Sequence, residues 1–149
     1  SNYFSTVVWM VLGYGALRVF ELTHYSLGVL LIHPVGTKAF ALRSYRRSVV
    51  LALHNYCEVL FWFAAAYRYL AGHFGDKADI VRGIDGSLYY SIVTMATVGY
   101  GDIAPQDVLT RWLCIVHIAV SGILTLVVLA RLIALLPTPP TLDSSEQNR

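Results

Sequence analysis

The sequence predicts an all-α membrane protein, and three observations lead to this prediction. Of the 149 residues, 56% are hydrophobic and only 13% are charged, whereas about a quarter of the residues of a soluble domain are charged. Two apolar stretches are long enough to cross a bilayer, which takes roughly 20 helical residues. A half-length apolar stretch lies between them and ends in a segment with glycines at alternate positions. The net charge of +2 gives no indication of nucleic-acid binding.

The two long stretches run over Val49–Ala71 and Val108–Leu136. The second contains Arg111 near its start and Arg131 near its end, where long side chains can extend to the lipid headgroups. Prolines follow this stretch, and the polar residues 138–149 lack the apolar side chains of a core. We therefore expect a disordered tail there.

A further apolar stretch, Tyr3–Leu22, precedes both helices. It is long enough either to span the bilayer or to lie in its interface, and we favour a spanning helix. Its Gly13-Tyr14-Gly15 lies inside a continuous apolar run, which indicates small residues for helix packing. The next piece, Tyr25–Ile32, is too short to cross and is followed by the helix breaker His33-Pro34. We interpret this piece as an interfacial connection, so that residues 1–47 form a membrane or interfacial helix and a basic connection.

The region between the two long helices has a polar part and an apolar part. Gly72–Asp85 is polar with balanced charge, and Gly86–Ala96 is apolar and aromatic but only about half a membrane long. Asp85 is well placed as the N-cap of the short helix, because its carboxylate would face unpaired amides. A helix that ends inside the membrane is re-entrant, and non-helical backbone at that depth must be buried in protein or line water.

The basic residues predict the orientation of the chain. Four of them cluster before the first long helix, with no acid among them: Lys38, Arg43, Arg46 and Arg47. The positive-inside rule places this 38–47 segment and the C-terminal tail in the cytoplasm, and the 72–85 loop, or turret, outside a plasma or bacterial inner membrane. A voltage sensor has arginines recurring through a membrane helix. These arginines precede the apolar run, so we expect weak intrinsic voltage dependence.

The segment that follows the half-length helix is Thr97-Val98-Gly99-Tyr100-Gly101-Asp102. To cross a low-dielectric slab, a potassium ion must exchange its water shell for fixed oxygens, and the exchange must be nearly even. Backbone carbonyls supply such oxygens if an extended chain aims them at one axis. Gly99 and Gly101 tolerate the backbone angles that this requires. The Thr97 hydroxyl would add an inner ring of oxygens, while Val98 and Tyr100 would point into the surrounding protein.

The segment Ser87–Pro105, SLYYSIVTMATVGYGDIAP, closely resembles the pore domain of the potassium channel family. In that family an outer helix, a re-entrant pore helix with its filter loop, and an inner helix form each subunit. The resemblance implies the same order for Val49–Ala71, Gly86–Ala96 and Val108–Leu136. It implies that residues 48–137 form a potassium channel pore domain and that four copies surround one pathway as a homotetramer.

The resemblance also implies what the chain binds and does. Potassium is expected to bind at Thr97, Val98, Gly99 and Tyr100, with Gly101 completing the filter. Conduction would be passive and potassium-selective, with membrane lipid and the other subunits as partners and with no cofactor beyond the permeant ion. The sequence contains no recognisable nucleophile–base set, metal-ligand spacing or phosphate loop, so we do not expect an enzyme.

Supporting residues are implied by the same resemblance. Tyr89 and Tyr90 occupy aromatic positions behind the filter, and we expect Tyr90 to hydrogen-bond Asp102. Val93 stands where some relatives carry a glutamate that shares a proton with the filter aspartate, so inactivation through such a pair is not expected. Ser121-Gly122 lies where relatives often carry a hinge glycine. Close packing against a neighbour is the alternative reading of that pair.

The ionisable residues within the long helices include two histidines and a glutamate. We interpret His117 as a structural histidine packed behind the pore helix in preference to a proton sensor. His54 and Glu58 are four residues apart, and we expect them to pair with each other inside the membrane.

Three alternatives to a selective channel remain open from the sequence. A less selective cation channel usually lacks the filter tyrosine or the second glycine, and both are present here. Subunits of potassium uptake transporters carry several degenerate filter segments per chain, whereas this chain has one complete segment. A membrane subunit that regulates a channel without conducting belongs to a different class, and ion flux through the purified chain separates it from a channel.

Overall fold

The computed structural model describes residues 2–32 and 42–133. Within these ranges every regular element is helical, which confirms the predicted all-α fold. The elements are α1 (Asn2–Ile32), α2 (Leu42–Tyr69), the 3₁₀ helix η1 (Ala71–Lys77), α3 (Ala78–Arg82), α4 (Ile84–Met95) and α5 (Val108–Ile133).

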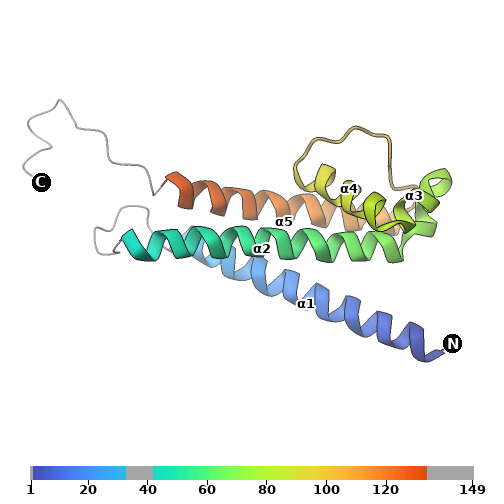
Figure 1. Cartoon of the computed structure of the whole chain (residues 1–149), viewed down its shortest axis with the longest axis horizontal. Helices are drawn as coiled ribbons and strands as arrows, with labels where there is room; N and C mark the ends of the chain where they lie inside the picture. The colour runs from blue at the N-terminus through green and yellow to red at the C-terminus, as the bar shows by residue number, and fades with distance from the viewer. Residues whose placement is uncertain (1, 33–41, 134–149) are drawn as a thin grey trace, which may run out of the picture.

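Three of the described helices are long and apolar enough to cross a membrane. Their candidate spans are Ser5–Gly28, Val49–Tyr69 and Val108–Ile133. Helices α2 and α5 lie side by side, the short helix α4 packs against both at one end, and α1 runs along the pair and diverges toward its N-terminus (Figure 1). The expected order of a long helix, a half-length helix, a loop and a second long helix is confirmed.

The boundaries of the helices differ from the sequence prediction at three places. Helix α1 continues to Ile32, so the separate connection expected at Tyr25–Ile32 is wrong, because no helix breaker precedes His33. Helix α2 begins at Leu42 and includes the cluster of arginines, since arginine is a good helix former. Helix α4 begins at Ile84 after Gly83, which occupies the N-cap position that we assigned to Asp85. Lys38, His33-Pro34 and the tail lie outside the described residues.

The core lies between α2, α4 and α5 and is rich in aromatic side chains. Tyr67 of α2 is fully buried and contacts Tyr90 of α4 edge-on, with ring centroids 4.7 Å apart. Its hydroxyl lies 3.0 Å from Nδ1 of His117 on α5, and the imidazole stacks on Phe63 at 3.9 Å. His117 is completely buried. The histidine is therefore a buried packing residue between α5 and α2, which agrees with the structural role predicted for it.

Helix α1 is tied to α2 by an ion pair within the candidate spans. Arg18 donates from Nε and Nη2 to the two carboxylate oxygens of Glu58 at 3.0 and 3.1 Å, and from Nη1 to Glu21 at 2.6 Å. Such a two-pronged contact is among the stronger hydrogen-bonded pairs. The expected pairing of Glu58 with His54 is wrong, because a cation from a neighbouring helix satisfies the carboxylate.

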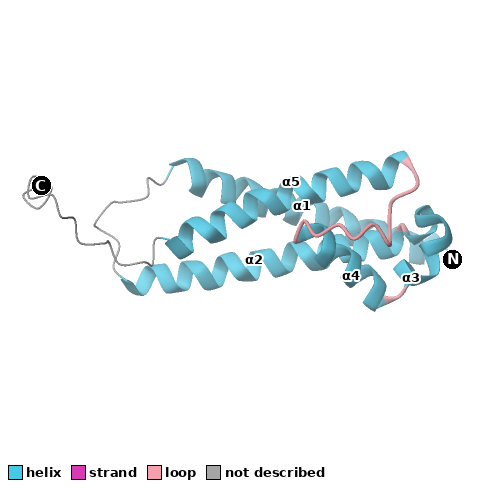
Figure 2. Cartoon of the chain, turned by 90° about the horizontal axis from the view of Figure 1, so that it is seen from above, coloured by secondary structure: helices cyan, strands magenta, loops and turns pink. Residues whose placement is uncertain are grey.

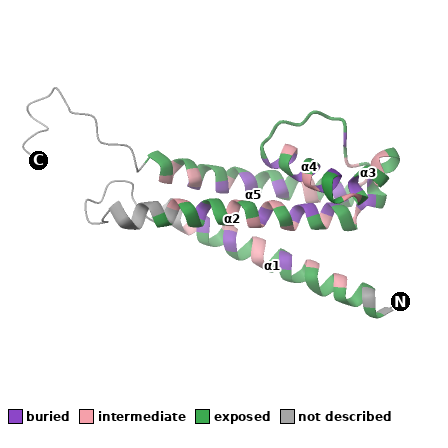
Figure 3. Cartoon of the chain, viewed as in Figure 1, coloured by how far each residue is buried: buried purple, intermediate pink, exposed green. Residues whose placement is uncertain are grey.

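Large apolar side chains cover the outside of the helices. Along α1 they include Trp9, Met10, Leu17 and Phe20, all more than 60% exposed. Figure 2 shows that the long helices run lengthwise along the molecule, and Figure 3 shows exposed residues over most of the outer faces. An apolar outer surface of this extent is stable against lipid or another apolar partner and not against water.

Candidate functional site

The candidate filter segment, residues 97–102, leaves the end of α4 and enters the loop that leads to α5 (Figure 2). The amide of Ala96 donates to Ile92 at 2.8 Å, and those of Thr97 and Val98 donate to Thr94 and Val93, both at 3.0 Å. These bonds close the last turn of the helix. From Val98 onward the backbone is non-helical, so the segment is not an extension of the pore helix.

The backbone of the segment alternates in handedness. Thr97, Gly99 and Gly101 have φ angles of +55°, +60° and +78°, whereas Val98 and Tyr100 are not among the residues with positive φ. Such an alternation turns successive peptide groups to the same side of the chain, where an ordinary strand would alternate them. Thr97 is the only non-glycine residue with positive φ in the described part of the chain. A threonine held there costs on the order of 1–3 kcal/mol, which tertiary structure must offset.

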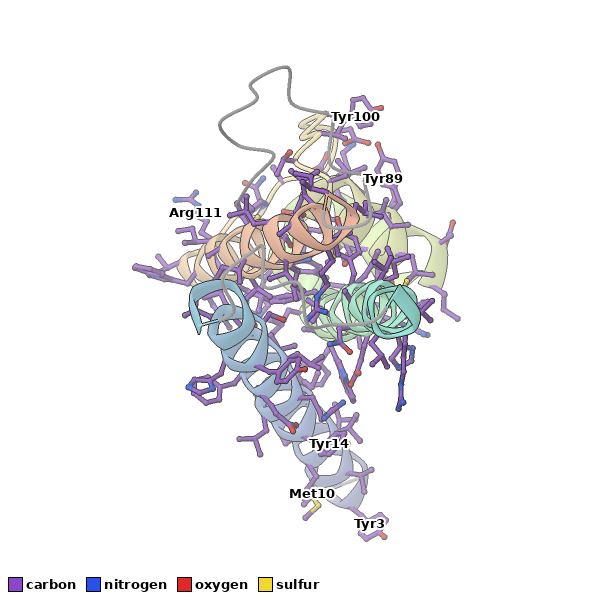
Figure 4. All side chains as sticks on the ribbon, turned by 90° about the vertical axis from the view of Figure 1, so that its left-hand side faces the viewer. Tyr3, Met10, Tyr14, Tyr89, Tyr100 and Arg111 are labelled. Carbon is purple, nitrogen blue, oxygen red and sulfur yellow. The ribbon has the colours of Figure 1, made fainter. Side chains whose placement is uncertain are left out.

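The side chains of the filter segment have little cover within a single chain. Val98 is 50% exposed and Tyr100 is 71% exposed. Figure 4 places Tyr100 on the same side of the molecule as Tyr89, at its periphery. We expected both filter side chains to enter surrounding protein, and one chain does not supply that protein.

Asp102 accepts a hydrogen bond from the hydroxyl of Tyr89 at 2.7 Å. The expected contact between Tyr90 and Asp102 is therefore wrong. Tyr90 is only 6% exposed, and its hydroxyl lies 3.6 Å from Sγ of Cys114. Adjacent residues on a helix point about 100° apart, so only one of the two tyrosines can face the loop.

The loop after the filter segment is fastened to the turret, a contact that the sequence prediction missed. The amide of Gln106 donates to the carbonyl of His73 at 3.2 Å, and His73 Nδ1 lies 2.6 Å from Asp107 Oδ2. Asp107 also caps α5, because it accepts from the amide of Thr110 at 2.9 Å and from the Thr110 hydroxyl. An aspartate directly before an apolar helix was the available sequence signal for this cap.

These contacts have an electrostatic consequence for Asp107, which lies outside the candidate spans. The hydrogen bonds from the side chain and then the backbone of Thr110 lower the pKa of the Asp107 carboxyl below its ordinary value, and His73 adds to this effect. The carboxylate form is therefore the one that holds the loop and the start of α5 together.

The hinge candidate Ser121-Gly122 lies in the middle of an unbroken α5. Ser121 is buried and its hydroxyl donates to the carbonyl of His117 at 2.7 Å. A Cβ built at Gly122 would meet nothing within 4 Å. Close packing within the chain therefore does not explain this glycine, and its role as a hinge stays a prediction.

Side chains do not form a metal site in the described ranges. No group of three or more His, Cys, Asp or Glu residues lies close enough to hold an ion there.

Comparison with known proteins assigns the class. Residues 55–137, more than half of the chain, match the family described as Ion channel. The chain therefore belongs to this ion channel family, and its three apolar helices make it an integral membrane protein.

The individual proteins that the chain resembles share about 30% identity with it. The chain is 31% identical over 86 residues, 58% of its length, to the voltage-gated potassium channel Kch of Escherichia coli. It is 30% identical over 95 residues, 63% of its length, to the voltage-gated potassium channel regulatory subunit KCNF1 of Rattus norvegicus and of Homo sapiens. The matched parts cover 20% of Kch and 17% of KCNF1, so the chain spans only about a fifth of these relatives. No solved structure matches it significantly.

Proposed function

We propose that the chain is a subunit of a potassium-selective channel that conducts potassium passively through a filter formed by residues 97–101. The observation that carries this proposal is the alternation of positive φ at Thr97, Gly99 and Gly101. Membership in the ion channel family and similarity to two proteins named as potassium channel components support it.

The mechanism follows from the backbone of the filter. Carbonyls turned to one side replace the water shell of potassium, so that an ion enters without a large loss of solvation energy. Helix α4 ends at Met95, directly before these carbonyls. The partial negative charge at its C-terminal end attracts a cation to the inner mouth of the filter. The electrochemical gradient drives the ion, and no bond is made or broken.

A filter of this kind requires several chains. Non-helical backbone at membrane depth must be covered by protein or line water, yet Val98 and Tyr100 are at least half exposed in one chain. Four copies around one axis would cover these side chains and complete each ring of oxygens. Residues 48–137 would form the pore domain of this homotetramer.

The proposed orientation follows from charge. The 38–47 segment and the 138–149 tail would lie in the cytoplasm, and the 72–85 turret outside a plasma or bacterial inner membrane. Helix α2 has Arg43, Arg46 and Arg47 in its first turns, before the candidate span that begins at Val49, and a single further arginine, Arg68, in its last turn. The described helices do not have the recurring membrane arginines of a voltage sensor, so we expect the conductance through this chain to vary only slightly with voltage.

A reversal potential tests this function directly. The full chain is reconstituted in planar bilayers between solutions of potassium and sodium chloride. A reversal potential close to the potassium equilibrium value supports the proposal. A value near zero with robust current indicates a less selective cation channel, and a steep conductance–voltage curve contradicts the expected weak voltage dependence.

A non-conducting regulatory subunit is the second candidate, because KCNF1 is named as one. The chain alone would then assemble in the bilayer without carrying current. It would change the current only when a conducting channel is reconstituted with it. Potassium current from the chain alone excludes this candidate.

A further inference from the structure

A polar cavity lies at the end of the helix bundle opposite the filter loop. Its volume is about 200 Å³, and α1, α2 and α5 all contribute to its wall. The polar residues of the wall are Tyr25, Ser26, Asn55 and Arg131. None of the proposed filter residues takes part.

Arg131 stands out among the arginines of the described ranges. Its Nε is buried and has no hydrogen-bond partner. No ion pair with a described acidic residue compensates its charge, whereas Arg18 is paired with Glu58 and Glu21. Arg131 as a whole is half-buried, and a buried donor atom without a hydrogen-bond partner is costly. The unpaired Nε in the last turn of α5 is therefore placed to donate to an anion that the described residues do not provide.

The rest of the wall is suited to the same kind of ligand. Ser26 is 3% exposed, and together with Tyr25 and Asn55 it brings hydroxyl and amide groups that can donate hydrogen bonds. None of the described residues of the wall carries a carboxylate. Leu51, Ala52 and Leu124 complete the wall with apolar surface.

The position of the cavity relative to the membrane identifies the source of the anion. The candidate spans end at Gly28 in α1 and Ile133 in α5 and begin at Val49 in α2, so Ser26, Leu51 and Arg131 are all within three residues of a membrane boundary. This is the depth of lipid headgroups. We propose that the cavity binds the phosphate of an anionic phospholipid. Arg131 would contact the phosphate, and the apolar part of the wall would contact the first part of an acyl chain.

Lipid binding by purified full-length protein tests the proposal. Native mass spectrometry of the protein in detergent, titrated with phosphatidylglycerol and with phosphatidylcholine, gives the affinity for each lipid. Wild-type protein should prefer phosphatidylglycerol, and Arg131→Gln should weaken phosphatidylglycerol binding about tenfold, the effect expected for loss of one charge-assisted contact. Arg131→Lys keeps the positive charge but lacks the planar guanidinium group. Its affinity for phosphatidylglycerol should lie between those of wild type and Arg131→Gln.

The matched control is Arg111→Gln at the other end of α5. Arg111 is exposed and donates to the carbonyl of Gln106 at 3.3 Å, away from the cavity, so this variant should bind phosphatidylglycerol as wild type does. Circular dichroism shows whether each variant keeps its helices. If helical Arg131→Gln protein binds phosphatidylglycerol with wild-type affinity, the proposal is overturned. Displacement of the lipid by millimolar inorganic phosphate would assign the cavity to a soluble anion and would overturn the lipid as its ligand.

Discussion

The tripeptide Gly-Tyr-Gly occurs twice in this chain, and the two copies use glycine for different physical reasons. Gly13-Tyr14-Gly15 is part of the regular helix α1, where a Cβ at Gly15 would overlap the indole of Trp62. Gly99-Tyr100-Gly101 has positive φ at both glycines, yet a Cβ at either would meet nothing within 4 Å. In α1 glycine supplies space for a neighbouring helix. In the proposed filter, glycine allows a backbone conformation that other residues resist.

The local sequence explains why identical residues fold differently. The first copy lies in the middle of a long apolar run, where the helix continues on both sides. The second copy follows the closed last turn of α4 and precedes a loop held by Asp102 and Asp107. A tripeptide therefore predicts a filter only together with the half-length helix before it and the anchored loop after it.

The largest expected effect is that of Gly99→Ala. An alanine at positive φ costs about 1–2 kcal/mol, and the cost recurs in every subunit around the proposed axis. We expect potassium flux into liposomes to fall by more than about tenfold. Gly13→Ala is the matched control, because that helical position is open, and it should conduct as wild type does. A Gly99→Ala protein with wild-type flux and selectivity would contradict the filter assignment.

Gly15→Ala should have the next largest effect, on stability. The added methyl group meets a rigid ring and must push α1 away from α2, at a cost of about 1–3 kcal/mol. Thermal unfolding followed by circular dichroism measures this loss. Gly13→Ala should leave the midpoint unchanged or raise it, since alanine is the better helix former. Equal effects of the two substitutions would show that α1 does not pack as described.

A smaller effect is expected for Tyr89→Phe, which removes the hydrogen bond to Asp102. One such bond between exposed groups contributes about 1 kcal/mol or less. We expect a modest loss of potassium over sodium selectivity in reversal-potential measurements. Tyr14→Phe, the same change in the helical copy, should leave selectivity intact. If Tyr90→Phe altered selectivity and Tyr89→Phe did not, this would contradict the Tyr89–Asp102 contact and favour the pairing of Tyr90 with Asp102 that the sequence predicted.

The smallest expected effect is a loss of stability at low pH. It involves Asp107, which holds the loop after Gly99-Tyr100-Gly101 and has no counterpart beside Gly13-Tyr14-Gly15 in α1. The pKa of Asp107 is lowered in the folded protein, chiefly by Thr110. Its stabilising contribution is therefore complete above the pKa of the unfolded chain, about 4, and is lost as the pH falls through the lower folded value.

The test compares the variant His73→Gln with the double variant His73→Gln/Asp107→Asn. Because His73 is absent from both proteins, its own titration does not contribute to the difference between them. The difference in unfolding midpoint should stay constant from pH 7 to about pH 5 and shrink below about pH 4. A difference that grows on acidification would have the wrong sign for a lowered pKa.

The sequence predicts the long helices, the half-length helix and the position of the filter segment, because these depend on length, apolarity and a local motif. The sequence does not predict which of several possible partners a side chain contacts in the folded chain. Tyr89 and Tyr90 differ only in helical phase, and the phase follows from the small buried residues Ser87, Ser91 and Thr94, which turn Tyr90 toward α2 and α5. Their spacing was visible in the sequence and is the signal that was overlooked.

The partner of Glu58 shows a second limit of sequence reasoning. His54 is one turn away on the same helix, but the carboxylate is taken by Arg18, forty residues earlier in the chain. A contact between separate helices depends on how the helices cross, which a local spacing rule does not contain. The continuity of α1 through Ile32 was missed because the hydrophobic length of a span was taken as the length of the helix.

The uncovered side chains of Val98 and Tyr100 have a genetic implication. In the proposed tetramer all four chains contribute oxygens to each ring. A single defective chain would therefore disrupt a pathway whose other three chains are intact. Co-expression of a damaged copy should then silence far more current than its share of the protein, and such alleles should behave as dominant.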